Sequence, residues 1–175
     1  MRVPDWPAPI LNLDVLDSTN AHLRRLAAEH TPLWTVVLAA RQERGRGRVG
    51  RTWQSPLGNL HLSVLLPPPS TERLTLVPLL LAVAVQQALA DLGVAARLKW
   101  PNDLLVGDHK VAGILVETAF GGVPPGALVA GIGINVATVP PGVALATSLR
   151  REGYAGEPAA VAAARVSRSC DSFSV

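Results

Sequence analysis

The spacing of apolar and polar residues divides the first part of the chain into strands and a helix. A short strand is predicted over 13–17, and apolar residues then recur at helical spacing after Ser18, whose hydroxyl can cap that helix. The segment 31–42 is rich in β-branched and apolar residues, which favours a strand that ends at Gln42. Alternate positions of 60–66 are apolar, which predicts a strand with one buried face.

A long apolar helix is predicted over 70–92. Ser70 or Thr71 can cap its start, and Gly93 follows it where a helix stop belongs. Pro78 is compatible either with the true start of this helix or with a kink inside it.

The rest of the chain predicts further strands and a short ending. Three segments, 94–100, 103–120 and 126–139, have strand character, and the middle one is expected to fold into a hairpin about Gly107 and Asp108. Roughly six strands and two or three helices predict an α+β domain, a mixed and largely antiparallel sheet covered by helices on one side.

A last helix is predicted to begin at Glu157, but its apolar pattern is soon lost. We therefore expect a domain over 1–155 and a short C-terminal tail over 156–175.

The composition agrees with one globular domain. The chain has 175 residues, of which 49% are hydrophobic and 17% charged, and this excludes a disordered protein. Its longest apolar run, Leu76–Val85, is half of the roughly 20 residues that a membrane span needs. The N-terminus has prolines and an acid where a signal peptide would be apolar. We expect a soluble, cytoplasmic protein with no membrane segment.

Several kinds of chemistry find no support in the sequence. The single cysteine, Cys170, allows no internal disulfide, and the four histidines do not have the spacing of metal ligands, so metal ligands are left unknown. The segment GRGRVG is not a nucleotide-binding P-loop, because no lysine closes it.

Positive charge is concentrated in one place. The net charge is +3, and five of the sixteen basic residues lie in 41–53, together with three glycines. Fourteen basic residues are arginine, and the two lysines are Lys99 and Lys110. Positive charge concentrated in one segment indicates a local binding site, rather than a positive electrostatic potential over the whole surface.

The segment 41–53, here called the arginine-glycine loop, suits an anionic ligand. Its glycines permit close approach of the backbone, and Arg46, Arg48 and Arg51 can hold anionic oxygens. Because like charges repel, we expect the loop to be mobile when empty and to close over a ligand, excluding water. The alternative is nucleic-acid binding, and Trp53 offers a flat face for a base in either case.

The segment 131–135 alternates between two faces. Gly131, Gly133 and Asn135 share one face, which could be a floor for a flat ligand such as a purine or a surface on which another element packs.

The two lysines are expected at the starts of adjacent strands, in KWPND (99–103) and KVAGIL (110–115). Cations so placed could stabilise a transferring phosphate. Asp103 could be a magnesium ligand, a partner for a lysine, or a cap.

Five segments, in this order and at these separations, resemble the catalytic domain of biotin-protein ligases (biotin-[acetyl-CoA-carboxylase] ligases). They are STN at 18–20, Gln42 followed by GRGRVGRTW at 45–53, KWPND at 99–103, KVAGIL at 110–115, and GIGINV at 131–136. The resemblance covers residues 10–150 and implies a fold like that of class II aminoacyl-tRNA synthetases. It also implies a two-step reaction, in which biotin and MgATP form biotinyl-5'-adenylate and a lysine of a carrier protein then takes the biotin.

The resemblance implies a role for each matching residue. Those expected to bind biotin are Ser18, Thr19, Asn20, Gln42, Arg46, Gly47, Arg48, Lys110 and Gly113. Those expected to bind the nucleotide are Arg51, Trp53, Lys99, Asn102, Asp103 and Asn135, with Trp53 stacked on adenine and Asn135 at its edge. Lys110 and Arg48 are expected to be the catalytic residues, which stabilise the pentacoordinate phosphate. Closure of the loop would also keep water from the adenylate.

The resemblance also implies partners. The acceptor would be the biotin carboxyl carrier protein, a subunit of acetyl-CoA carboxylase. Repressor-type members begin with a helix-turn-helix domain, for which the residues before the core leave no room, so no DNA binding is expected. Members continue past 146–149 with a helix and a small β-barrel, whereas this sequence ends at Val175, and we expect a truncated C-terminus that affects carrier transfer more than adenylate formation. An exposed strand edge could pair two copies into a homodimer.

Three alternatives remain. A lipoate-protein ligase or octanoyl transferase would share the sheet and the lysine, but the arginine-glycine loop and KWPND resemble the biotin branch, and thiol-dependent transfer would need a placed cysteine. A nucleic-acid-binding module would lose affinity steeply with salt. The third alternative is a relic of a ligase that no longer catalyses the reaction.

Overall fold

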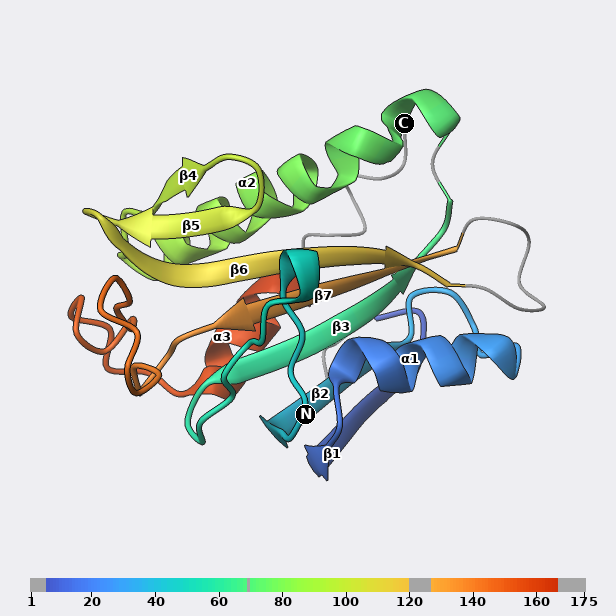
Figure 1. Cartoon of the computed structure of the whole chain (residues 1–175), viewed down its shortest axis with the longest axis horizontal. Coiled ribbons are helices and arrows are strands. Elements are labelled where there is room, and N and C mark those ends of the chain that lie inside the picture. Colours follow the sequence, from blue (N-terminus) through green and yellow to red (C-terminus); the bar gives the residue numbers. More distant parts are fainter. Residues whose placement is uncertain (1–5, 69, 120–126, 167–175) are drawn as a thin grey trace.

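One mixed β-sheet organises the chain (Figure 1). The computed structural model describes residues 6–68, 70–119 and 127–166, and within these ranges seven strands form a sheet in the order β1-β2-β3-β7-β6-β5-β4. The strands are β1 (Ile10–Leu16), β2 (Val36–Gln42), β3 (Leu60–Leu66), β4 (Arg97–Lys99), β5 (Asp103–Val106), β6 (His109–Thr118) and β7 (Leu128–Ile134). The helices are α1 (Thr19–Ala28), α2 (Val77–Asp91) and α3 (Pro158–Val166), with the 3₁₀ turns η1 (Arg48–Gly50) and η2 (Thr71–Leu76).

Most neighbouring strands of the described sheet are antiparallel. Only β1 and β2 pair in parallel, and α1 connects them, because parallel neighbours need a crossover between them. The central strands β3 and β7 pair along their whole length, from Leu60 opposite Ile134 to Leu66 opposite Leu128. The predicted α+β fold with a mixed, largely antiparallel sheet is confirmed.

Helices cover both faces of the sheet, and the expectation of helices on one side was wrong. α2 and α3 pack over the larger apolar core on one face, against strand residues such as Leu62 and Ile132. α1 packs on the opposite face, where Leu23 and Ala27 join a second apolar cluster that includes Leu65. β3 is therefore buried at every position, not only at alternate ones. α1 covers its face only around Leu65, which leaves the other end of that face open.

The boundaries of α2 follow from two residues. The helix begins at Val77 with Pro78 in its first turn, where the missing N–H leaves no hydrogen bond unmade. Gly93, with φ of 81°, follows the end of the helix as predicted. Pro78 thus marks the start of α2 and not a kink.

One described helical stretch, Leu74–Asp91, is long and apolar enough to cross a membrane, judged by length and composition alone, with a mean hydropathy of 1.7. The core helix of a globular domain meets the same criteria, and α2 buries Leu81, Val85 and Leu89 in the larger core.

The ends of the other elements differ from expectation in two places. The hairpin about Gly107–Asp108 is confirmed, but β4 is only three residues long and lies at the edge of the sheet. The expected tail over 156–175 contains α3, whose Val161 and Ala162 are buried in the larger core, so packed structure continues past residue 155. The rest of that stretch, 167–175 with Cys170, lies outside the described residues.

We predict that Leu149→Ala lowers the free energy of unfolding by about 2–5 kcal/mol, because its fully buried side chain would leave a cavity in the core. Leu145→Ala is the matched control: its side chain is 66% exposed, and we expect a change of about 0.5 kcal/mol or less. Urea denaturation of both variants measures the difference. Equal effects would show that the segment 145–149 is not anchored in the core.

Candidate functional site

A cavity of about 310 Å³ lies on the face of the sheet that α1 leaves open. Its walls come from the start of α1, the arginine-glycine loop, β5, β6, β7 and the segment 140–146. Of the residues predicted to bind a ligand, those that line it are Ser18, Thr19, Asn20, Gln42, Arg46, Gly47, Arg48, Arg51, Trp53, Asn102, Asp103, Lys110, Gly113 and Asn135. Only Lys99 among the predicted residues is left out.

Glycines form the floor of this cavity. Gly131 and Gly133 lie on β7, and Gly113 lies opposite Gly133 on β6. A Cβ atom at Gly133 would lie 2.5 Å from the indole of Trp53, and one at Gly131 would overlap the amide of Asn20. The glycine face is therefore not bare, because two side chains of the site lie directly on it.

A hydrogen bond to His61, a residue for which the sequence predicted no role in the site, orients Trp53. The indole Nε1 donates a hydrogen bond to Nδ1 of His61 over 3.3 Å, and Nζ of Lys110 lies 5.3 Å from the ring centroid. His61 is 1% exposed, and burial lowers its pKa from the ordinary 6.5 to about 4. A neutral imidazole can accept through Nδ1, so the low pKa preserves the hydrogen bond at neutral pH. The only sequence signal was a histidine in a largely apolar strand.

The start of α1 supplies polar groups to one end of the cavity. Ser18 occupies the N-cap position, but its side chain makes no capping hydrogen bond. The Thr19 amide and hydroxyl both donate to Oε1 of Gln42, over 2.8 and 3.1 Å, and Nε2 of Gln42 donates to Ser55. The expectation that the Ser18 hydroxyl caps the helix was wrong, because it accepts from no backbone N–H of the first turn, and the N–H of Ser18 itself donates to Asp17.

Asp17 also fixes the helix to the chain that precedes it. Arg25 donates two hydrogen bonds of 2.9 Å to its carboxylate, and this pairing lowers the pKa of Asp17 to about 2.

Two cations meet polar partners on β5 and on the turn before it. Nζ of Lys110 lies 2.7 Å from Oδ1 of Asp103, and Nη1 of Arg48 donates to Oδ1 of Asn102 over 3.1 Å. Asp103 is thus a lysine partner, one of the three roles considered for it. Nδ2 of Asn102 donates to the carbonyl of Ile114, which fixes the amide.

Lys99 does not line this cavity in the described structure. Lys99 is the last residue of β4, not the first of its strand, and β5 separates β4 from β6. Because β4 is the edge strand, the Lys99 side chain is exposed to solvent.

The arginine-glycine loop forms a small hairpin over the cavity. The backbones of Arg46 and Thr52 form an antiparallel bridge across it. The Gly47 amide donates to the Arg51 carbonyl, and the Trp53 amide donates to the Gly45 carbonyl. A Cβ atom at Gly45 would overlap the Trp53 carbonyl, so this glycine permits closure of the hairpin on itself.

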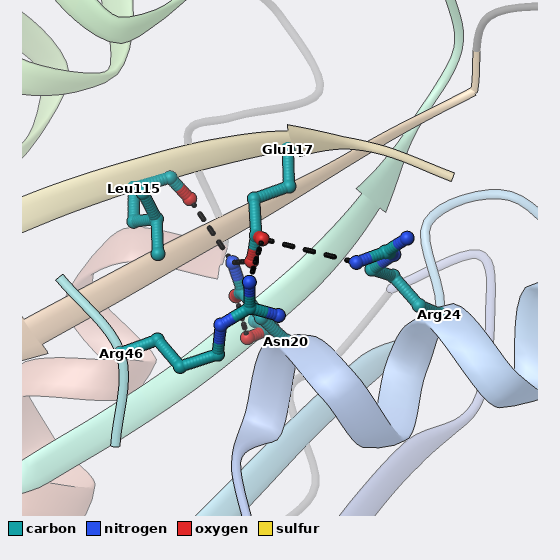
Figure 2. Close-up of polar contacts among 6 residues, drawn as sticks. Asn20, Arg24, Arg46, Leu115 and Glu117 are labelled. Atoms are coloured by element: carbon teal, nitrogen blue, oxygen red, sulfur yellow. Dashed lines mark hydrogen bonds and ion pairs between the residues drawn. The ribbon is translucent and has the colours of Figure 1, made fainter. Parts of the chain in front are cut away.

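The charges of this loop are partly compensated without a ligand, so its arginines repel one another less than their number alone implies. Nη2 of Arg46 lies 3.0 Å from Oε1 of Glu117, a residue of β6 that the sequence analysis did not single out (Figure 2). Loop mobility in the absence of ligand stays a prediction.

The far end of the cavity is closed by Asn135 and the segment 140–146. Nδ2 of Asn135 donates to the Thr147 carbonyl, while its buried Oδ1 has no hydrogen-bond partner among the described residues. Ala146 forms a parallel bridge with Lys110, which attaches this segment to β6. Only the resemblance pointed to the region around Ala146, because it has no regular apolar pattern. A buried acceptor without a partner is ready for a donor on a ligand.

Among the described residues, no group of three histidine, cysteine or acidic side chains could hold a metal ion by itself. The oxygens of Asp103 and Asn102 could supplement a magnesium ion that a nucleotide already binds through its phosphates, because Mg²⁺ in such sites needs only one or two protein ligands.

Comparison with known proteins places this site in a family context. Residues 13–135 match the model of the biotin/lipoate A/B protein ligase family. The chain is 40% identical over 129 residues to the bifunctional ligase/repressor BirA of Bacillus spizizenii, covering 70% of this chain and 39% of that protein. It is 40% identical over 157 residues to the biotin-[acetyl-CoA-carboxylase] ligase of Paracoccus denitrificans, covering 81% of this chain and 63% of that protein.

Among solved structures, the biotin protein ligase of Aquifex aeolicus in complex with biotin and ATP has a TM-score of 0.80 at 32% identity. The match covers 93% of this chain and 69% of that one. The chain thus spans less than two thirds of the length of both sequence relatives, and about two fifths of the first.

We predict that His61 makes stability depend on pH between about 6.5 and 4. The unfolded chain protonates His61 near pH 6.5 and the folded protein only near pH 4, so stability present above pH 6.5 is lost as the pH falls through this window. The loss reaches about 3 kcal/mol. Urea denaturation of wild type and His61→Gln at several pH values measures it, and parallel profiles for the two proteins would contradict the prediction.

Proposed function

The chain belongs to the biotin/lipoate A/B protein ligase family, and we propose that it activates biotin with MgATP and transfers the biotinyl group to a lysine of a carrier protein. Biotinyl-5'-adenylate is the intermediate. The observation that carries the proposal is the order of side chains along β7: Asn20 lies on Gly131, Trp53 lies on Gly133, and Asn135 follows at the end of the strand. The polar start of α1 would suit the biotin end of an acyl adenylate. The aromatic face of Trp53 and the amide acceptor of Asn135, further along the same line, would suit its adenine end.

The head group of biotin would bind at the start of α1. Its cyclic urea offers two N–H donors and one carbonyl acceptor, which need a compact set of hydrogen-bonding groups. Ser18, Thr19 and Gln42 supply such groups on adjoining elements, and the Gln42 amide is oriented by Ser55. A ligand there would replace the Thr19–Gln42 contact with its own.

Lys110 and Arg48 would act on the reacting phosphate. A biotin carboxylate oxygen attacks the α-phosphorus, the bond to pyrophosphate breaks, and negative charge accumulates on the phosphate oxygens. Lys110 carries its positive charge at the cavity wall, 2.7 Å from Asp103, and Arg48 lies on the loop above. Both cations are positioned before the ligand arrives, so little reorganisation is needed as the charge develops.

The adenine would bind against Trp53 and Asn135. The indole provides a stacking face, and its orientation is set by the hydrogen bond to His61. The free Oδ1 of Asn135 can accept from the exocyclic amine of adenine. Arg51, on the exposed side of the loop, would neutralise the polyphosphate. Magnesium enters as part of MgATP, with Asp103 and Asn102 as the protein groups that would contact it.

In the second step the lysine amine of the carrier attacks the carbonyl carbon of the mixed anhydride, and AMP leaves. The relative from Paracoccus denitrificans bears the name of a ligase for acetyl-CoA carboxylase, so we propose the biotin carboxyl carrier protein as acceptor. We further propose a cytoplasmic site of action, where ATP is supplied. A homodimer through an edge strand, β1 or β4, is part of the same proposal.

The alternatives find less support. The family model covers biotin and lipoate ligases together, but the two relatives described above, each 40% identical, are named as a ligase/repressor and a biotin ligase. For nucleic-acid binding, arginines should form an open basic surface. Instead Arg46 pairs with Glu117 and Arg48 contacts Asn102 at the cavity.

We predict biotin-dependent exchange of pyrophosphate into ATP, and a loss of about 100-fold or more in Lys110→Ala, because a cation at the reacting phosphate is removed. Lys99→Ala is the matched control, since this lysine is exposed on the edge strand outside the cavity; its rate should stay within about twofold of wild type. Replacing biotin by lipoate or octanoate tests the related ligases. Exchange with lipoate but not biotin, or none in a folded protein, would refute the proposal.

A further inference from the structure

The carboxylate of Glu117 joins three separate elements beside the cavity. Figure 2 shows it on β6 between α1 and the arginine-glycine loop. Its Oε1 lies 3.0 Å from Nη2 of Arg46 and 3.8 Å from Nη1 of Arg24, and its Oε2 accepts a hydrogen bond of 2.8 Å from Nδ2 of Asn20. The side chain is 16% exposed, so the charge is largely withdrawn from water.

The position of Glu117 in the sheet explains why it has these partners. It lies opposite Val129, which in turn lies opposite Leu65, so it is in the row that α1 covers. The next row along the sheet contains Leu115 and Gly131, at the floor of the cavity. Glu117 therefore lies where the apolar layer under α1 meets the ligand cavity. A carboxylate beside an apolar layer is costly unless it is paired, and both arginines and the amide pair it.

Through Asn20, Glu117 also fixes the start of α1. Nδ2 of Asn20 donates to Glu117 and to the Leu115 carbonyl, and its Oδ1 accepts a hydrogen bond from Ser63. All polar atoms of the amide are thus engaged within the protein, and the side chain fills the space above Gly131. Asn20 is in the expected place but is committed to shaping the cavity.

The side chain of Arg46 is likewise engaged within the protein. Its guanidinium points to Glu117 (Figure 2), while its backbone belongs to the hairpin of the loop through the bridge to Thr52. The contact between Arg46 and Glu117 joins two charged groups. Arg48, by contrast, donates to the neutral amide of Asn102, on the turn before β5. Charge-assisted hydrogen bonds are about twice as strong as neutral ones.

We propose that Glu117 is a positioning residue that holds the arginine-glycine loop over the cavity through Arg46, and that it thereby sets the affinity for biotin. This rests on the proposed biotin ligase function. Glu117 touches no reacting atom, so its contribution lies in binding and not in the chemical step. Arg46 anchors the loop, which leaves Lys110 and Arg48 for the phosphate.

The first experiment is limited trypsin digestion of the ligand-free chain. Beyond β2, which includes Arg41, the loop offers cleavage after Arg44, Arg46, Arg48 and Arg51, and mass spectrometry identifies cuts there. Because cleavage follows the open population of a loop, Glu117→Gln should be cut about fivefold faster or more at these sites. Arg24→Gln is the matched control: Arg24 contacts the same carboxylate from α1 but is not in the loop, so the cutting of the loop should be unchanged.

The second experiment separates positioning from a general loss of structure. In pyrophosphate exchange, Glu117→Gln should raise the KM for biotin about tenfold, with kcat at saturating biotin and the KM for ATP within about twofold. Arg46→Gln approaches the pair from the other side and should give the same pattern. The double variant should be no worse than either single one, because the two side chains act as a unit.

The outcomes are distinct. Unchanged cutting of the loop and an unchanged KM for biotin in Glu117→Gln would overturn the proposal. A fall in kcat together with a fall in the free energy of unfolding would also overturn it, because it would indicate a merely structural role. If the wild type shows no exchange at all, the ligase function fails, and trypsin digestion alone then decides whether Glu117 holds the loop.

Discussion

The absence of side chains at Gly113, Gly131 and Gly133 is the constraint on which the site depends. These glycines lie together on two paired strands, and each leaves room that a Cβ atom would take from Trp53, Asn20 or Lys110. The indole and the amide can therefore lie directly on the backbone of the sheet. α1 covers only one end of this face, so the cavity has a rigid floor made by the central strands and a roof made by a loop.

The cations of the site have partners before any ligand arrives. Lys110 is paired with Asp103, and Arg46 is paired with Glu117. Paired charges can be held close together in a cavity without strong repulsion, and in the proposed reaction a phosphate would compete with Asp103 for Lys110. The two pairs differ in their surroundings, because Asp103 lies in the cavity wall whereas Glu117 lies under the edge of α1. The proposed roles follow this difference: Lys110 would exchange Asp103 for a phosphate, whereas Glu117 would keep Arg46 in place.

The same separation between ligand-binding and framework groups applies to the neutral residues. Within the described ranges Asn135 keeps an acceptor without a partner at one end of the cavity, and Asn20 has none left at the other. His61 supports Trp53, and its burial keeps the ring neutral so that it can accept the indole N–H. The neutral residues thus divide into those that support the cavity and one that keeps an acceptor for a ligand.

The sequence by itself determined the element types, the order of the motifs and most of the residues of the cavity. β3 and the hairpin at Gly107–Asp108 were predicted from alternation and turn residues, because these signals are local. The tertiary structure decided what depends on strand order and on packing. Lys99 is outside the site because β4 is the edge strand, and helices lie on both faces because Leu65 belongs to a second apolar cluster. Glu117 and His61 became visible only in the fold, because ion pairs and hydrogen bonds between distant residues leave no periodic trace in the sequence.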